Sequence, residues 1–333
     1  MAADKSPPAA TIADRTRIGV YVDLDLVGDA LIKLPFLRAL RHAYPAAEIT
    51  WIAGRGKSAF AGALAPLAAG LLDRVLENAG TGAELAKALG GRLDLLIDTQ
   101  GMLGTALALR RLKPHGFVTE AAWGLPGWPP RCMPRPPRHL ATRLLATLRH
   151  VIGAEPRPDA PLLLPAPSTA LAERLLPAGK RYVAQVLGAG GKHKAWPEAM
   201  HVDLTRQLMA AGITPVLILG PDEADRHGDL AAALPGALFP LQMATALGDT
   251  AAPDLTIALA RRCMAAVAAD CGGGHMMAAA GIPLISLFGP TDPKKFAPAA
   301  ARLALLRAQD FGGRETAAIP VAAVLDALTQ SFG

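Results

Sequence analysis

The stretch RIGVYVDLDLVGDALIKLPFLRALRH, residues 17–42, decides the fold, because a strand pattern is followed directly by a helix pattern. Residues 17–24 are rich in β-branched and apolar side chains, which predicts a buried strand. Residues 29–42 carry apolar side chains at helical spacing, which predicts a helix. A strand followed at once by a helix is the repeating unit of a parallel α/β sheet.

This unit recurs along the chain in two series. The first continues with strands at 48–52 and 94–99 and helices at 58–69 and 102–112. The proline-rich stretch GAEPRPDAPLLLPAP, residues 153–167, then interrupts it as a linker. The second series predicts strands at 181–187, 214–219, 265–269 and 284–288, and helices at 198–211, 222–233, 274–280 and 320–332. We therefore expect an α/β protein with two Rossmann-like, doubly wound domains, residues 1–160 and 161–333, and a central cleft.

The composition argues against several classes of protein. With 51% hydrophobic and 19% charged residues, the chain is typical of globular proteins. Residues 1–17 lack the apolar run of a signal peptide, and the longest uncharged stretch, residues 276–291, is short for a membrane span. The three cysteines are widely spaced and form no C-x-x-C motif. This pattern indicates reduced thiols in a cytoplasmic protein and argues against a zinc site.

The net charge of +6 comes from one segment. Residues 101–160 carry nine basic and three acidic side chains, whereas the charges cancel in the rest of the chain. A solvated surface explains this excess as well as a face for an anionic partner, such as a phosphorylated glycolipid or a membrane surface. Nucleic acid is the weaker prediction, because no aromatic residues interleave with the basic ones in the pattern of a known module.

Ligands of doubly wound sheets bind at the carboxyl ends of the strands, so residues that directly follow strands are the candidates for a site. After the first strand, DLDLVGD (residues 23–29) contains Gly28, which would allow a tight turn, and Asp29 at the helix start. Asp29 either caps that helix or serves a ligand. Asp23 and Asp25 also match a D-x-D metal site, but so short a pattern often arises by chance.

A second candidate loop, IDTQG (residues 97–101), follows another buried strand. Its Asp98 and Gln100 would either hydrogen-bond a polyol or cap the next helix. The sequence leaves both interpretations open.

The third loop, LGAGGKHKAWP (residues 187–197), has the composition of a phosphate-binding site. It follows a strand and precedes a helix that starts with proline and glutamate. The backbone N–H groups of Gly190 and Gly191 would approach an anion closely, and Lys192 and Lys194 add full positive charges. Neither the P-loop pattern nor G-x-G-x-x-G is present in this loop.

The fourth loop also follows a strand and opens a helix. Its residues are Asp270, Cys271, Gly272, Gly273, Gly274 and His275. Because glycine has no side chain, the backbone N–H groups of these three residues could donate hydrogen bonds to a diphosphate. A histidine at a helix start is more often a surface residue than a ligand, but this one is flanked by glycines and an apolar run.

Taken together, these loops resemble glycosyltransferase family 9, the ADP-heptose:lipopolysaccharide heptosyltransferases. The family pattern is G-D before a helix with proline, then Y-P-x-A-x-I, I-D-x-Q-G, K-x-W-P, D-x-G-x-x-H and G-P-T-D-P. The matching residues are, in order, Gly28 and Asp29 with Pro35, then 44–49, 97–101, 194–197, 270–275 and 289–293. The chain departs from this pattern in two ways: Asp23 and Leu26 occupy a stretch that is often basic, and Cys271 replaces the usual threonine or serine.

The resemblance implies a GT-B architecture in which the first domain binds the acceptor and the second binds the nucleotide-sugar. It implies an inverting transfer without metal or cofactor, with Asp29 as general base and Lys194 neutralising charge on the departing diphosphate. The donor, ADP-heptose, would contact Gly190, Gly191, Lys192, residues 270–275 and a ribose-binding acid, which is Glu223 or else Asp222 or Asp225. A lipid-linked anionic glycan at the inner membrane would contact Gly28, Asp98, Gln100, Arg131, Arg135 and Arg138.

Other functions fit the sequence as well. A sugar-nucleotide epimerase of the same fold would bind a diphosphate but would need no second substrate. A non-catalytic sugar-nucleotide-binding protein would not need the carboxylate of Asp29. An NAD-dependent oxidoreductase is disfavoured, because the glycine fingerprint of such enzymes is missing.

Overall fold

The structure, a computed structural model, describes residues 16–121, 137–189, 191 and 194–332. The chain divides into two units, Met1–Leu163 (unit 1) and Leu164–Gly333 (unit 2). Each unit contains one five-stranded sheet whose strands all pair in parallel. The α/β class with two Rossmann-like domains, expected from the alternation of strand and helix patterns, is confirmed.

The sheet of unit 1 has the order β3-β2-β1-β4-β5. Its elements are β1 (Arg17–Val22), α1 (Val27–Ala43), β2 (Glu48–Ala53), η1 (Ala59–Ala61), α2 (Ala65–Ala68), β3 (Arg74–Leu76), α3 (Ala83–Leu89), β4 (Leu95–Asp98), α4 (Leu103–Arg110), β5 (Gly116–Thr119) and α5 (Leu140–Ile152). The chain runs outward from β1 to β3 and then returns to the other side of β1. The order therefore reverses between β1 and β4, which is where such sheets bind their ligands.

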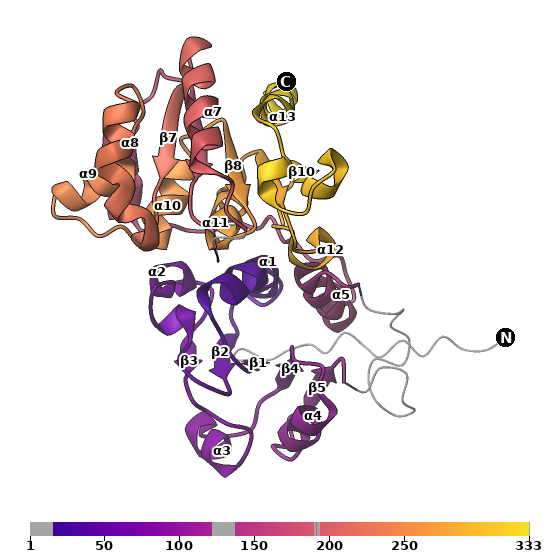
Figure 1. The fold of residues 1–333 in the computed structure, drawn as a ribbon. Helices are drawn as coiled ribbons and strands as arrows, with labels where there is room; N and C mark the ends of the chain where they lie inside the picture. Colours follow the sequence, from indigo (N-terminus) through magenta and orange to yellow (C-terminus); the bar gives the residue numbers. More distant parts are fainter. Residues whose placement is uncertain (1–15, 122–136, 190, 192–193, 333) are drawn as a thin grey trace. The chain divides into compact units, whose positions relative to one another are not determined.

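Both faces of this sheet are covered by helices. In Figure 1, α1 and α5 lie on one side of the strands, and α3 and α4 lie on the other. Because side chains alternate along a strand, Tyr21, Ile52 and Leu96 face α3, where they pack against Leu85 and Leu89. The neighbouring strand residues are buried as well, so the central strands are apolar on both sides.

The sheet of unit 2 has the order β10-β9-β8-β6-β7 and reverses between β6 and β8. Its elements are α6 (Ala166–Leu175), β6 (Tyr182–Val186), α7 (Glu198–Ala210), β7 (Thr214–Ile218), η3 (Pro221–Arg226), α8 (His227–Ala233), α9 (Pro240–Ala246), α10 (Pro253–Ala260), β8 (Ala265–Ala269), α11 (Gly272–Ala280), β9 (Leu284–Phe288), α12 (Pro293–Phe296), β10 (Leu303–Arg307), η4 (Ala308–Phe311), η5 (Thr316–Ala318) and α13 (Val321–Ser331).

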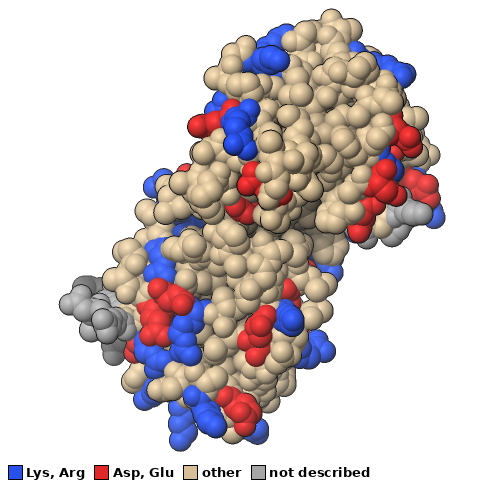
Figure 2. All heavy atoms as spheres, turned by 90° about the vertical axis from the view of Figure 1, so that its left-hand side faces the viewer, with Lys and Arg blue, Asp and Glu red and all other residues tan. Residues whose placement is uncertain are grey.

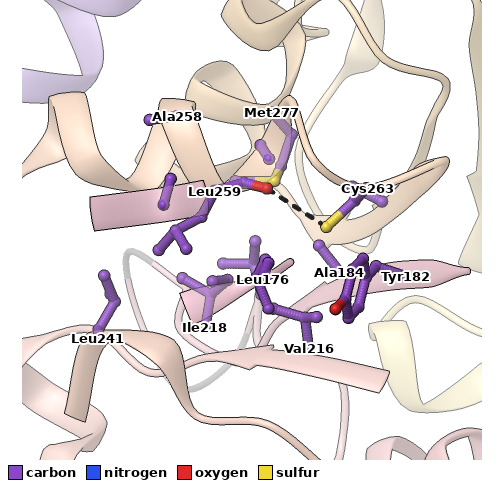
Figure 3. Close-up of a cluster of buried hydrophobic side chains, with 14 of the residues drawn as sticks. Leu176, Tyr182, Ala184, Val216, Ile218, Leu241, Ala258, Leu259, Cys263 and Met277 are labelled. Atoms are coloured by element: carbon purple, nitrogen blue, oxygen red, sulfur yellow. Dashed lines mark hydrogen bonds between the residues drawn. The ribbon is translucent and has the colours of Figure 1, made fainter. Parts of the chain in front are cut away.

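An apolar cluster covers one face of the second sheet (Figure 3). Tyr182 of β6 and Ile218 of β7 belong to it, together with Leu241 of α9 and Leu259 of α10. The Sγ of Cys263 donates to the carbonyl oxygen of Leu259 at 3.5 Å, and burial raises the pKa of this thiol to about 12. Cys263 is therefore a neutral core side chain. The opposite face of the sheet packs against α7 and α13.

The sequence patterns missed three of the four edge strands. β3, β5 and β10 were not predicted, and all three lie at sheet edges. Their residues are less buried than those of the central strands, so they lack the continuous apolar run that marks a strand covered on both faces. The expected helix at residues 58–69 is wrong in detail, since Gly62 separates η1 from α2. The expected helix at 222–233 begins as the 3-10 helix η3 and continues as α8.

The charged side chains are mixed in sign on the face shown in Figure 2. Lysine and arginine lie there among aspartate and glutamate, with broad areas of other residues between them. In the described part of the chain, no helix combines the length and the apolar character needed to cross a membrane.

A buried polar chain links α7 to the second sheet. His201, 2% exposed, packs edge-on against Trp196 with the ring centroids 4.9 Å apart. Its Nδ1 lies 3.0 Å from Oε1 of Gln185, whose Nε2 donates to Oγ1 of Thr205 at 2.8 Å. Burial, with a smaller contribution from the charge of Arg226, lowers the pKa of His201 to about 3. The folded protein therefore keeps this imidazole neutral.

This histidine should make the protein acid-sensitive. Below about pH 6.5, His201 is protonated in the unfolded chain but stays neutral in the folded protein. The free energy of unfolding therefore decreases as the pH falls toward 3. Relative to His201→Gln, the unfolding free energy of the wild type should fall by about 1.4 kcal/mol per pH unit in this window. Urea unfolding of both proteins between pH 7 and pH 4 measures the difference. Parallel curves would contradict the prediction.

Candidate functional site

The four loops selected from the sequence lie at the two points where strand order reverses. In unit 1, the loops after β1 and β4 follow neighbouring strands. In unit 2, the loops after β6 and β8 also follow neighbouring strands. Because parallel strands end at the same edge, each unit brings two candidate loops together at its carboxyl edge (Figure 1).

Asp29 is the third residue of α1 and is half-buried. The helix begins after Leu26 and has no side-chain hydrogen bond at its cap, so Asp29 does not act as the N-cap. A carboxylate in the first turn interacts favourably with the helix dipole. The capping interpretation left open by the sequence does not apply, and the Asp29 carboxylate is the acidic group of the first turn.

The expectation of a tight turn at Gly28 is wrong. Gly28 is the second residue of α1, and its backbone is outside the left-handed region that favours glycine. In the described part of the chain, no atom lies within 4 Å of the position that a Cβ would occupy. Neither packing nor backbone geometry therefore requires glycine at this position, and the space beside the first turn of α1 is open.

Asp23 and Asp25 each have protein partners of their own. Asp23 accepts hydrogen bonds from Nε of Arg55 at 2.8 and 2.9 Å. Asp25, 1% exposed, accepts from Oγ of Ser58 at 2.6 Å and from Nε1 of Trp51 at 2.9 Å. The D-x-D pair is therefore bound to two separate sets of side chains. Among the residues that the structure describes, no group of three or more His, Cys, Asp or Glu side chains could hold a metal ion.

Asp98 holds the second loop in place. It is 1% exposed and accepts hydrogen bonds from Oγ1 of Thr119 at 2.7 Å and from the backbone N–H of Gln100 at 2.9 Å. Burial raises the pKa of Asp98, and these two hydrogen bonds oppose the shift. Gln100 is only half-buried, and its Nε2 donates to Oγ1 of Thr99 at 3.3 Å. Of the two acceptor contacts predicted in this loop, Gln100 is the one with exposed surface.

The predicted acceptor arginines are only partly described. Arg131 and Arg135 lie outside the described residues. Arg138 is exposed and immediately precedes His139, the N-cap of α5. Their contact with an acceptor stays a prediction.

An ion pair connects the two candidate loops of unit 2. Nζ of Lys194, from the loop after β6, lies 3.0 Å from Oδ2 of Asp270, which follows β8. The backbone of the loop after β6 is held by Thr316, whose Oγ1 donates to the carbonyl oxygen of Ala195 at 2.6 Å. The lysine side chain is a quarter exposed and the aspartate one tenth exposed. Gly190 and Lys192 lie outside the described residues, whereas Gly191 is described and its carbonyl oxygen accepts from the N–H of Lys194 at 2.9 Å.

Glycines form the first turn of α11. A Cβ on Gly273 would lie 2.6 Å from Cγ1 of Val186, so glycine allows α11 to approach β6 closely. A Cβ on Gly274 would lie 3.3 Å from the carbonyl oxygen of Ala269, whereas no atom of a described residue lies within 4 Å of such a position on Gly272. The first N–H groups of a helix have no acceptor within the helix and favour an anion. Among the residues that the structure describes, none therefore covers the start of α11 on the side of Gly272.

The last predicted donor contacts are Cys271, His275 and Glu223. Burial raises the pKa of the Cys271 thiol to about 11, so the thiol is neutral, and His275 is 7% exposed. Glu223 is half-buried, and its carboxylate faces Gly188, where a Cβ would lie 2.6 Å from Oε2. Burial raises the pKa of Glu223, and the charge of Arg226 opposes this shift.

The structure distinguishes Glu223 from its acidic neighbours. Asp222 and Asp225 are exposed, whereas Glu223 turns toward the end of β6. It thus joins the loops after β6 and β8 at the same edge of the sheet. Sequence reasoning missed Thr316 and Lys33, a buried residue one helical turn beyond Asp29. A signal for Lys33 existed, since it is a lone charge within the apolar run ALIKLPFL, residues 30–37.

Comparison with known proteins gives consistent results. The family model of glycosyltransferase family 9 (heptosyltransferase) matches residues 83–316. Lipopolysaccharide heptosyltransferase 1 of Pseudomonas aeruginosa is 35% identical over 116 residues, which are 34% of this chain and 30% of the relative. The chain thus aligns with about a third of the length of this curated relative.

Solved structures show the same fold. The glycosyl transferase family 9 protein of Veillonella parvula superposes with a TM-score of 0.71 at 16% identity, over 95% of this chain and 97% of that one. E. coli heptosyltransferase WaaC with ADP superposes with a TM-score of 0.67 at 21% identity, over 95% and 100%. The expected GT-B fold class is confirmed. Because the family model covers more than half of the chain, the protein belongs to glycosyltransferase family 9 (heptosyltransferase).

Proposed function

We propose that the protein is an inverting glycosyltransferase that moves a heptose or related sugar from a nucleotide-diphosphate donor to a lipopolysaccharide core acceptor. Family membership supports this, as do the relative named lipopolysaccharide heptosyltransferase 1 and the related WaaC structures with ADP and with ADP-2-deoxy-2-fluoro heptose. ADP-heptose is accordingly the proposed donor. The observation that carries the proposal is the Lys194–Asp270 pair beside the open start of α11.

Unit 2 binds the donor in this proposal. The N–H groups at the start of α11 donate to the diphosphate, and the Lys194 ammonium lies at the same edge of the sheet. As the sugar leaves, negative charge grows on the diphosphate, and a fixed cation there stabilises the transition state more than the ground state. Glu223 faces the same edge and accepts hydrogen bonds from ribose hydroxyls.

Unit 1 binds the acceptor through the space beside Gly28 and through Gln100, with the arginines of the basic segment as further contacts. Asp29 accepts the proton of the acceptor hydroxyl. The oxygen of that hydroxyl forms a bond to the anomeric carbon, and the bond from this carbon to the diphosphate breaks. A single displacement from the opposite side inverts the anomeric configuration, and ADP leaves with the electron pair.

The test is an assay with ADP-heptose, a lipopolysaccharide core acceptor that lacks heptose, and the full chain. We expect ADP and an acceptor enlarged by one heptose, with inverted configuration, only when both substrates are present. Conversion of the donor without acceptor would support the epimerase instead. Tight donor binding with no turnover under any acceptor would support the non-catalytic binding protein.

We further propose that unit 1 contacts an anionic membrane surface through α4. Leu103 and Leu107 lie one turn apart on this helix and are 50% and 47% exposed, and Met102 just before them is 59% exposed. The exposed cations Arg111 and Lys113 follow the helix. Exposed apolar side chains beside cations suit the headgroup region of an anionic bilayer. We expect the wild-type protein to float with anionic vesicles but not with zwitterionic ones. The variant Leu103→Ser/Leu107→Ser should no longer float with anionic vesicles. Equal flotation of the wild type and this variant would overturn the proposal.

A further inference from the structure

A buried lysine lies one helical turn beyond Asp29. Lys33 is 4% exposed, and its Nζ lies 3.5 Å from Oδ1 of Asp25, which is itself 1% exposed. Oδ2 of Asp25 accepts the two hydrogen bonds from Ser58 and Trp51, whereas Oδ1 accepts none from the described residues. The ammonium of Lys33 is therefore the group that compensates the charge on Oδ1.

Two carboxylates act on this one ammonium. Burial lowers the pKa of Lys33, and the charges of Asp25 and Asp29 oppose that shift. Asp29 is four residues before Lys33 on α1, the spacing at which helical side chains meet. The three side chains carry one net negative charge when all are ionised. Asp25 and Lys33 are enclosed, so the half-buried Asp29 is the member with exposed surface.

Asp25 also anchors the start of α1. Its carbonyl oxygen accepts from the N–H of Ala59 at 3.1 Å, and it forms a parallel bridge with Ser58. Its side chain reaches Trp51 of β2. These contacts connect the loop before α1 to β2 and to the segment after it. The N-cap residue of α1 makes no side-chain hydrogen bond of its own. Lys33 binds the same carboxylate from the second turn of the helix.

We propose that Asp25 and Lys33 are positioning residues for Asp29: the buried pair locks the first turn of α1 onto β2 and leaves the Asp29 carboxylate as the group presented to the acceptor hydroxyl. The inference rests on the proposed function, in which Asp29 is the general base. It assigns a catalytic purpose to a buried ion pair that costs desolvation and that apolar residues of similar size could replace.

The first part of the test concerns stability. Lys33→Met leaves the buried Asp25 carboxylate without its counter-charge, and we expect Tm to fall by roughly 10 °C. The double variant Asp25→Asn/Lys33→Met removes both charges and keeps an acceptor oxygen for Ser58 and Trp51. We expect its Tm to return to within about 3 °C of the wild type, because no unpaired ion remains.

The second part separates positioning from folding. At restored Tm, the double variant should lose about 10- to 100-fold in kcat with the KM for the donor unchanged, since small displacements of a reacting group have effects of this size. A matched control is Arg41→Met/Asp73→Asn, which removes an ion pair at the far end of the same helix. We expect that control to lower Tm but to keep kcat within about twofold of the wild type, because it lies some 18 Å along the helix from Asp29.

Different outcomes overturn different claims. A double variant with wild-type kcat, in a protein whose Asp29→Asn variant is inactive, would overturn the positioning role and leave the proposed function intact. Absence of any transfer by the wild-type protein would overturn both. If the double variant is as unstable as Lys33→Met, the unpaired charge of Asp25 is not the cause of the lower Tm. That outcome would also contradict the inference.

Discussion

Replacement of Asp29 by asparagine is expected to lower kcat by about 10²–10⁴-fold, the range that one positioned general base contributes. Asparagine has nearly the same shape as aspartate but accepts no proton at neutral pH. Asp29 is not the cap of α1, so the substitution removes no capping hydrogen bond. Binding of ADP, which we assign to unit 2, should remain unchanged, because the loss falls on the chemical step.

Initial rates with ADP-heptose and acceptor, together with calorimetric titration of ADP, measure the two effects separately. Asp23→Asn is the matched control, since it removes a carboxylate from the same loop, where Asp23 pairs with Arg55. We expect this control to keep kcat within a few-fold of the wild type. An Asp29→Asn protein with kcat close to the wild-type value would remove Asp29 from the reaction.

Replacement of Lys194 by methionine has the second large expected effect, a loss of about 10- to 100-fold in affinity for ADP. A hydrogen bond to a charged group contributes about 1.5–3 kcal/mol, and about 1.4 kcal/mol corresponds to a factor of ten. Methionine keeps much of the apolar stem and removes the ammonium that lies 3.0 Å from Asp270. At an ADP concentration 100 times the wild-type Kd, stabilisation by ADP should fall from about 2.7 kcal/mol to between about 1.4 and 0.4 kcal/mol.

The controls isolate the phosphate contact from the ion pair. Adenosine lacks the diphosphate, so its weaker binding should be equal in wild type and variant. Lys194→Met/Asp270→Asn removes the unpaired carboxylate left by the single variant, and its ADP affinity should stay low. Lys180→Met removes an exposed charge just before β6, at the amino end of this strand and away from the proposed site, and should bind ADP normally. Equal ADP affinity in the wild type and Lys194→Met would exclude Lys194 from the phosphate site.

The sequence predicted most of what depends on local backbone structure. The central strands β1, β6, β8 and β9 appeared at or near their observed bounds, because strands buried on both faces require continuous apolar runs. The edge strands β3, β5 and β10 did not appear, because a partly exposed strand has no such run. The loops that carry Asp29 and Lys194 could be selected because strand ends, glycines and charges are all readable along the chain.

The sequence alone determined the α/β class, the two series of strands and the chemistry of the four loops, since each of these follows from residues close together along the chain. Only the tertiary structure decided which loops meet. Strand order puts β1 beside β4 and β6 beside β8, and it thereby pairs Lys194 with Asp270 across 76 positions of sequence. It also buried Asp25 with Lys33 and turned Glu223 inward while its acidic neighbours stayed exposed. Such contacts depend on the order of the strands in each sheet, which side-chain periodicity does not encode.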